Sequence, residues 1–181
     1  EKEEPPAAAR AELAVALASQ VRTSRRAFQV FQEAVRRGDP LRLDVCAALA
    51  PSCARSGLAA EAKVLQRQML AAGKHLPDNM RIQLITAFGK ATARAGCGEG
   101  EKVRLLASAW QLMEGSRADG RVPVEVLDAL LQAHCFDSSL VPNAYGLLEM
   151  YSDYGFAPRA SSFGIVLKAL EADAAAFRKL W

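Results

Sequence analysis

The feature that most constrains this chain is a set of landmarks that recurs four times along it. Each copy opens with an alanine, continues with mostly apolar or small residues three and seven positions later, and ends at a glycine that proline follows. The four glycines are 35, 47 and 35 residues apart, and the opening alanines have the same spacing. These residues are Gly38, Gly73, Gly120 and Gly155, with Ala27, Ala62, Ala109 and Ala144. A fixed period of this length is typical of repeat proteins.

Each copy has the pattern of an amphipathic helix followed by residues that terminate it. In the clearest copy, Ala62, Leu65 and Met69 lie at i, i+3 and i+7 and share one helix face. Gly73 can adopt the left-handed conformation that ends a helix, and Pro77 prevents the helix from resuming. A second element precedes each copy, because residues 84–91 follow the similar residues 49–56 by 35 positions. The pattern predicts pairs of antiparallel helices and no β-strand.

The predicted fold class is therefore all-α, an α-solenoid of antiparallel helix-turn-helix repeats with a period of about 35 residues. The expected helices are 8–21, 24–37, 42–55, 58–72, 79–94, 101–116, 124–135, 141–154 and 160–172, with a helical tail to Trp181. Residues 1–7 are expected to be a disordered or linker segment, and residues 8–181 one solenoid of about four and a half repeats. Because the chain starts at Glu1, we expect a processed protein or a piece of a longer one.

One repeat carries about twelve extra residues, since its glycine step is 47 rather than 35. We place them in a loop insertion near 92–101, where Gly96, Gly98 and Gly100 favour a longer loop. The last repeat raises a separate expectation, because terminal repeats of a solenoid need polar caps. An uncapped end at Trp181 predicts self-association.

Composition excludes several classes of protein. Hydrophobic residues make up 51% of the chain, which is enough for a continuous core and argues against disorder. No stretch is long and apolar enough to predict a membrane span. The net charge is +3, from 23 basic and 20 acidic residues, so charge alone does not predict a nucleic-acid partner. The one basic concentration favours a solvated helix face over a binding patch; it comprises Arg22, Arg25, Arg26, Arg36, Arg37 and Arg42.

No motif in the sequence predicts catalysis, a cofactor or a metal site. The cysteines fit neither a CxxC zinc site nor a dense disulfide framework; they are Cys46, Cys53, Cys97 and Cys135. Cys46 and Cys53 share a helix face and are expected to be small buried side chains. His75 and His134 lie in different repeats, without a Cys, Asp or Glu at ligand spacing. We therefore expect no enzyme, no cofactor, no metal and no small-molecule substrate.

The sequence resembles the pentatricopeptide repeat family over about residues 8–172. The resemblance is carried by Glu61-Ala62, Leu65, Met69, Gly73 and Pro77-Asp78, followed by Leu84-Ile85-Thr86-Ala87-Phe88-Gly89-Lys90-Ala91. Tetratricopeptide repeats step by about 34 residues and have Trp-Leu-Gly and Tyr landmarks that this chain lacks. The resemblance implies a right-handed superhelix whose first helices line a concave face. It also implies single-stranded RNA binding in an organelle, with the mitochondrion favoured over the chloroplast.

The resemblance further implies where RNA would be contacted. The family chooses bases from one place in the first helix and one at the end of the repeat. In this chain the first-helix place holds Ala47, Ile82, Asp128 and Gly164, of which only Asp128 can hydrogen-bond a base edge through its side chain. Arg55 and Lys90 occupy matching places from which some members contact phosphate. The alternative for these two cations is a favourable interaction with the helix dipole near helix ends.

Three functional hypotheses follow. The favoured one is a non-catalytic scaffold, or sequence-independent RNA-contacting subunit, of a large organellar assembly such as a mitochondrial ribosome or an RNA-processing complex, because a legible base code is absent. The second is a single-stranded RNA-binding module of an organellar RNA-maturation or translation factor. The third is the substrate-binding arm of a larger enzyme. Protein subunits are the expected partners, and RNA is a candidate partner.

Overall fold

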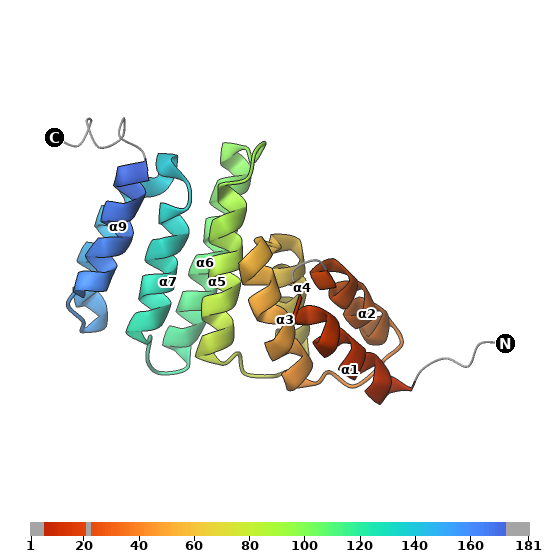
Figure 1. Ribbon diagram of the computed structural model, residues 1–181. Helices are drawn as coiled ribbons and strands as arrows, with labels where there is room; N and C mark the ends of the chain where they lie inside the picture. The colour runs from red at the N-terminus through yellow and green to blue at the C-terminus, as the bar shows by residue number, and fades with distance from the viewer. Residues whose placement is uncertain (1–5, 21–22, 173–181) are drawn as a thin grey trace.

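The computed structural model describes residues 6–20 and 23–172 (Figure 1). Within these ranges the protein is all-α, with nine α-helices, two short 3₁₀ turns and no strand. The helices are α1 (Ala7–Ala18), α2 (Ser24–Arg36), α3 (Leu43–Ser56), α4 (Ala59–Ala71), α5 (Asp78–Thr92), α6 (Glu99–Ala118), α7 (Val124–Cys135), α8 (Val141–Met150) and α9 (Ala160–Ala172). The all-α prediction is confirmed for the part of the chain that the structure describes.

The helices pack largely in neighbouring pairs, α1 with α2, α3 with α4, α5 with α6 and α7 with α8. The first helix of each pair also packs against the first helix of the next, from α1 through α3, α5 and α7 to α9. Figure 1 shows these first helices side by side, with α1 at the N-terminal end and α9 at the C-terminal end. One hydrophobic core therefore runs from Ala14 in α1 to Leu170 in α9.

The four glycines of the repeat end helices in the way that their spacing predicts. Gly38, Gly73, Gly120 and Gly155 have φ values of 78°, 62°, 112° and 77°. These positive values lie where a β carbon is costly, so glycine is favoured over other residues. Each glycine lets the chain leave a second helix, or the 3₁₀ turn Ser152–Tyr154 that follows α8, and turn toward the next first helix.

The extra residues of the long repeat are divided between a loop and a helix. The loop between α5 and α6 covers residues 93–98, whereas residues 57–58 suffice between α3 and α4. Helix α6 has 20 residues against 13 in α4, and α5 has 15 against 14 in α3. Residues 99–101, which we placed in the loop, form the first turn of α6. Glu99 and Glu101 favour this start, because carboxylates stabilise a helix N-terminus.

Two predicted helices end three or four residues earlier than expected. The helix predicted over 141–154 stops at Met150, and the 3₁₀ turn Ser152–Tyr154 carries the chain to Gly155. The helix predicted over 8–21 stops at Ala18. Of the predicted linker 1–7, Pro6 is the N-cap of α1 and Ala7 is its first residue. The predicted tail to Trp181 lies outside the described residues, and so does the self-association expected from it.

None of the helices in 6–20 and 23–172 combines the length and the apolar character that a bilayer crossing requires. This agrees with the absence of a long apolar stretch in the sequence.

Candidate functional site

The face formed by the first helices offers few groups that could read a base. Ala47 and Gly164 are exposed, and Ile82 is half-buried. None of these three side chains has a hydrogen-bond donor or acceptor. Three of the four places that the resemblance assigns to base reading therefore cannot form a hydrogen bond to a base through a side chain.

The fourth place, Asp128, belongs to a hydrogen-bonded cluster that joins α7 to the start of α9. Tyr151 Oη donates to Asp128 Oδ1 at 2.7 Å, and Ser162 Oγ donates to the same oxygen at 2.6 Å. The Arg159 guanidinium donates to Asp128 Oδ2, so both carboxylate oxygens accept hydrogen bonds within the protein. Burial acts to raise the pKa of Asp128, but these three donors outweigh it and hold the pKa below its usual value. The side chain is only 16% exposed.

Arg55 caps the end of α1. Its Nη2 donates to the carbonyl oxygen of Ala18 at 2.7 Å and to Ser52 Oγ at 2.9 Å. Ser52 Oγ itself donates to the Ala18 carbonyl at 2.5 Å. Ala18 is the last residue of α1, so its carbonyl lacks a partner within the helix. Arg55 thus has a structural role, although the residue remains exposed.

Lys90 of α5 occupies the position that matches Arg55 of α3, 35 residues later. Its Nζ is 5.9 Å from the centroid of the Phe136 ring, at the end of α7, which is a cation–π distance. A β carbon built on Gly57, two residues after Arg55, would lie 3.1 Å from Lys90 Cβ. The two cations thus extend toward different neighbours: the Arg55 guanidinium contacts the end of α1, and Lys90 Nζ contacts the end of α7. Asp128 contacts the start of α9. RNA contact by these residues remains a prediction.

A buried arginine that the sequence analysis did not single out connects α5 to α6. Arg81 is 4% exposed. Its Nε donates to the carbonyl of Leu76 at 2.8 Å, its Nη1 to the carbonyl of Leu112 at 3.1 Å, and its Nη2 to the carboxylate of Asp119. A β carbon at Gly115 would lie 2.9 Å from Arg81 Nη1. Glycine at 115 therefore gives the guanidinium its space.

The repeat register could have revealed Arg81. It follows Cys46 by 35 residues and precedes Leu127 by 46, and both of these residues are buried. A charge at a position that is otherwise apolar signals a buried hydrogen-bonded group.

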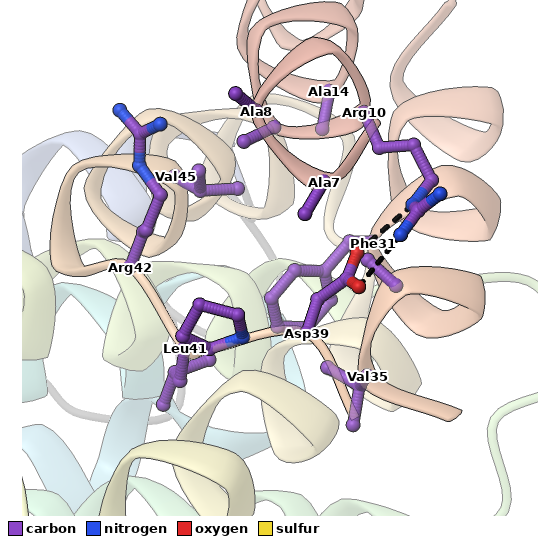
Figure 2. A pocket seen from close by; sticks show the side chains of 13 residues that line it. Ala7, Ala8, Arg10, Ala14, Phe31, Val35, Asp39, Leu41, Arg42 and Val45 are labelled. Atoms are coloured by element: carbon purple, nitrogen blue, oxygen red, sulfur yellow. Dashed lines mark hydrogen bonds and ion pairs between the residues drawn. The ribbon is translucent and has the colours of Figure 1, made fainter. Parts of the chain in front are cut away.

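The most enclosed pocket described lies between α1, α2 and α3 (Figure 2). It has a volume of about 200 Å³, and most of its walls are apolar; these are Ala7, Ala8, Ala11, Ala14, Phe31, Ala34, Val35, Pro40, Leu41 and Val45. At its edge Arg10 donates from Nε and Nη2 to the two oxygens of Asp39, at 2.9 and 2.6 Å. The hydrogen bond from Arg10 lowers the pKa of Asp39. We call this the N-terminal pocket.

The N-terminal pocket exists because α1 has small residues where the other first helices have large ones. Ala14 is in register with the buried residues Leu49, Leu84 and Leu130. Alanine lacks the three side-chain carbon atoms with which leucine fills the matching space. The first helix therefore packs over a cavity that its counterparts fill.

Leucine at position 14 is expected to stabilise the protein, because it would fill part of this cavity. Ala14→Leu should raise the free energy of unfolding by about 1 kcal/mol and the Tm by about 2–4 °C. Ala18→Leu is the matched control, since Ala18 is equally buried in α1 but does not line the pocket; overpacking there should lower the Tm. Thermal unfolding followed by circular dichroism measures both, and equal losses of stability would contradict the prediction.

His134 is buried between α6 and α7. Its Nδ1 lies 2.9 Å from the Leu130 carbonyl oxygen, so this nitrogen carries a proton and donates. The ring meets Trp110 edge to face, with centroids 6.3 Å apart. Burial lowers the pKa of His134, while the hydrogen bond to Leu130 opposes that shift.

This lowered pKa predicts a loss of stability in mild acid. Below about pH 6.5 the unfolded chain takes up a proton on His134 that the folded protein does not yet bind. The free energy of unfolding should therefore fall as the pH is lowered from about 6.5 toward the folded pKa. Melts of the protein and of His134→Gln across this range test the prediction, and the variant should have the shallower slope. Identical slopes would show that His134 does not cause the dependence.

Two of the four cysteines are buried thiols of low reactivity. Cys46 and Cys53 are fully buried, as their helical spacing predicts. Burial raises the pKa of Cys46 to about 11 and also raises that of Cys53, which keeps both thiols protonated. Within the described ranges, no group of three or more His, Cys, Asp or Glu residues is placed to hold a metal ion.

Comparison of the chain with protein-family models gives no match, and comparison with curated proteins gives no match either. The pentatricopeptide resemblance therefore rests on the quoted residues and their spacing alone. In its described part the chain is an all-helical protein of nine α-helices packed largely in neighbouring pairs.

Proposed function

We propose that this protein is a non-catalytic helical-repeat scaffold, a pentatricopeptide-like α-solenoid that holds neighbouring subunits in an organellar assembly and contacts any RNA without reading its sequence. The observation that carries this proposal is the lack of available hydrogen-bonding side chains at the four base-reading places. Ala47, Ile82 and Gly164 have no polar side-chain atoms, and the carboxylate of Asp128 accepts three hydrogen bonds from its own chain. A base meeting this face finds no side-chain donor at these places, and the one acceptor group, the Asp128 carboxylate, is already hydrogen-bonded within the protein.

The continuous contact of first helices supports the scaffold role. Five first helices follow one another, so a long face is available to a partner without any change of fold. The exposed charges on this face have both signs, as in Glu12, Asp44, Arg55 and Glu125. A mixed face of this kind favours contacts with folded protein over a polyanion. The organellar location, with the mitochondrion first, is part of the proposal and rests on the resemblance.

Fluorescence anisotropy with single-stranded RNA tests the proposal. We expect weak binding without sequence preference that is lost between about 50 and 200 mM salt. The Arg55→Ala/Lys90→Ala variant would show whether the two cations contribute, and Arg55→Lys/Lys90→Arg is the control that retains both charges. Salt-resistant, sequence-selective binding that the alanine variant abolishes would overturn the proposal and favour an RNA-binding module.

Because Arg55 also caps α1, the alanine variant needs a structural control. Ser52→Ala removes a hydroxyl from the same cap but keeps the arginine charge. An RNA affinity that falls in the double alanine variant and not in Ser52→Ala would assign the loss to charge rather than to disturbed packing.

A further inference from the structure

The two ends of the helix stack carry exposed apolar side chains in the same register as the contacts inside it. Inside the stack, Gly89 of α5 meets Ala133 of α7 so closely that a β carbon at 89 would lie 2.4 Å from Ala133 Cα. Gly89 therefore marks the side of a first helix that faces the next first helix, and Ala133 marks the side that faces the previous one. The repeat register carries both sides over to the other first helices.

On α9, the side that faces a following helix is apolar and exposed. The buried residues Ser162, Val166 and Leu170 follow Val126, Leu130 and His134 of α7 by 36 positions, which sets the register. In this register Phe163 and Leu167 match Leu127 and Leu131, which are 5% and 0% exposed. Phe163 and Leu167 are 48% and 54% exposed. Glu171 follows Leu167 by one helical turn and matches Cys135.

We call Phe163, Leu167 and Glu171 the C-terminal end face. Helix α9 packs against α7, α8 and the 3₁₀ turn Ser138–Leu140, all of which precede it in the chain. The end face lies on the side of α9 that corresponds to the α7 side of α5.

At the other end of the stack, α1 exposes the side that corresponds to the α5 side of α7. Leu13 matches Ala129, which is 5% exposed, yet Leu13 is 46% exposed. Leu13 and Val30 line a groove of about 370 Å³ between α1 and α2. The remaining residues of this N-terminal groove are Arg10, Arg26, Gln29, Glu33 and Arg37. The groove thus has two apolar lining residues and three arginines, of which Arg10 pairs with Asp39 and Arg37 pairs with Glu33.

We propose that the C-terminal end face of one copy docks on the N-terminal groove of a second copy. Leu167 and Phe163 would pack on Leu13 and Val30, which continues the contact between successive first helices. The Glu171 carboxylate at one end and the exposed Arg26 guanidinium at the other have opposite charges, which favours a head-to-tail contact over contacts between like ends. A head-to-tail contact of this kind joins copies into an open series or a ring. This goes beyond the scaffold proposal, because the partner is the chain itself.

Sedimentation velocity of the chain tests the proposal. The average mass should rise steadily from about 1 to 100 µM protein, as mass action requires. Two double variants block one end each: Phe163→Glu/Leu167→Glu at the end face and Leu13→Glu/Val30→Glu at the groove. Each alone should remain monomeric, but an equimolar mixture should form a complex of twice the monomer mass, because one intact groove and one intact end face remain.

The control is Val103→Glu, which adds one such charge at a side chain that is 64% exposed away from both ends; it should associate like the parent chain. Circular dichroism melts confirm that each variant is folded. A parent chain that stays monomeric would overturn the proposal, as would a groove variant that still dimerises, which indicates contact between like ends. A mixture that stays monomeric would also overturn it.

Discussion

Replacing Gly89 with alanine is expected to lower the free energy of unfolding by about 2 kcal/mol, although alanine is the better helix former. The added β carbon would lie 2.4 Å from Ala133 Cα and 2.6 Å from Ala133 Cβ. Both atoms belong to the body of α7 and cannot rotate away, so α5 and α7 must separate. Ala54 of α3 and Cys135 of α7 occupy the same register, so this position holds a small side chain in each first helix from α3 to α7.

Gly146→Ala is the matched control for this prediction. Gly146 lies inside α8 and is exposed, and a β carbon added to it would have no neighbouring atom within 4 Å. Alanine there should raise the free energy of unfolding by about 0.5–1 kcal/mol, because it restricts the unfolded chain and favours the helix. Urea titrations of the two variants should give shifts of opposite sign. A stabilising Gly89→Ala would mean that the close α5–α7 contact is not required.

Replacing Arg81 with alanine is expected to lower the free energy of unfolding by about 3 kcal/mol. The substitution removes three donated hydrogen bonds and leaves the carbonyl oxygens of Leu76 and Leu112 without this partner. It also empties the space that the arginine stem fills between α5 and α6. Asp119 is 39% exposed, so water can solvate its carboxylate and the loss is smaller than for a fully buried pair.

Two further variants separate charge from geometry at this site. Arg81→Lys keeps the positive charge but cannot reproduce three donors directed at three acceptors, so it should recover less than half of the loss. Arg104→Ala on the exposed side of α6 is the control and should cost under about 0.5 kcal/mol. Chemical unfolding measures all three. An Arg81→Ala loss no larger than that of Arg104→Ala would contradict the assigned role.

Most of the helices could be predicted, because each repeat encodes its own turns. The glycine landmarks placed the helix ends, and the apolar spacing placed the faces toward the core. The 47-residue step showed that residues were added but not how they fold. Three glycines in 96–100 favoured a loop, yet Glu99 and Glu101 begin a helix there, since a helix needs only its first turn to be stabilised.

The candidate site was less predictable than the fold. The resemblance identified Arg55, Lys90 and Asp128 by position, but their partners come from other helices: Ala18, Phe136 and Arg159. These partners are 31 to 46 residues away in sequence. No local pattern reports a contact at such a separation. The same reason hid Arg81, whose acceptors include Leu112, 31 residues further on.

The sequence by itself determined the helical class, the period and the glycines that end the helices, because these depend on interactions within about one helical turn and on backbone conformation. Only the tertiary structure decided which polar groups are already paired and which apolar side chains stay exposed. Asp128 has the chemistry to read a base, but its neighbours in space occupy its oxygens; Leu167 has the pattern of a core residue, yet no described helix covers it. Both outcomes depend on which helices contact each other. Packing over the whole fold decides these contacts, and the type of residue at one position does not.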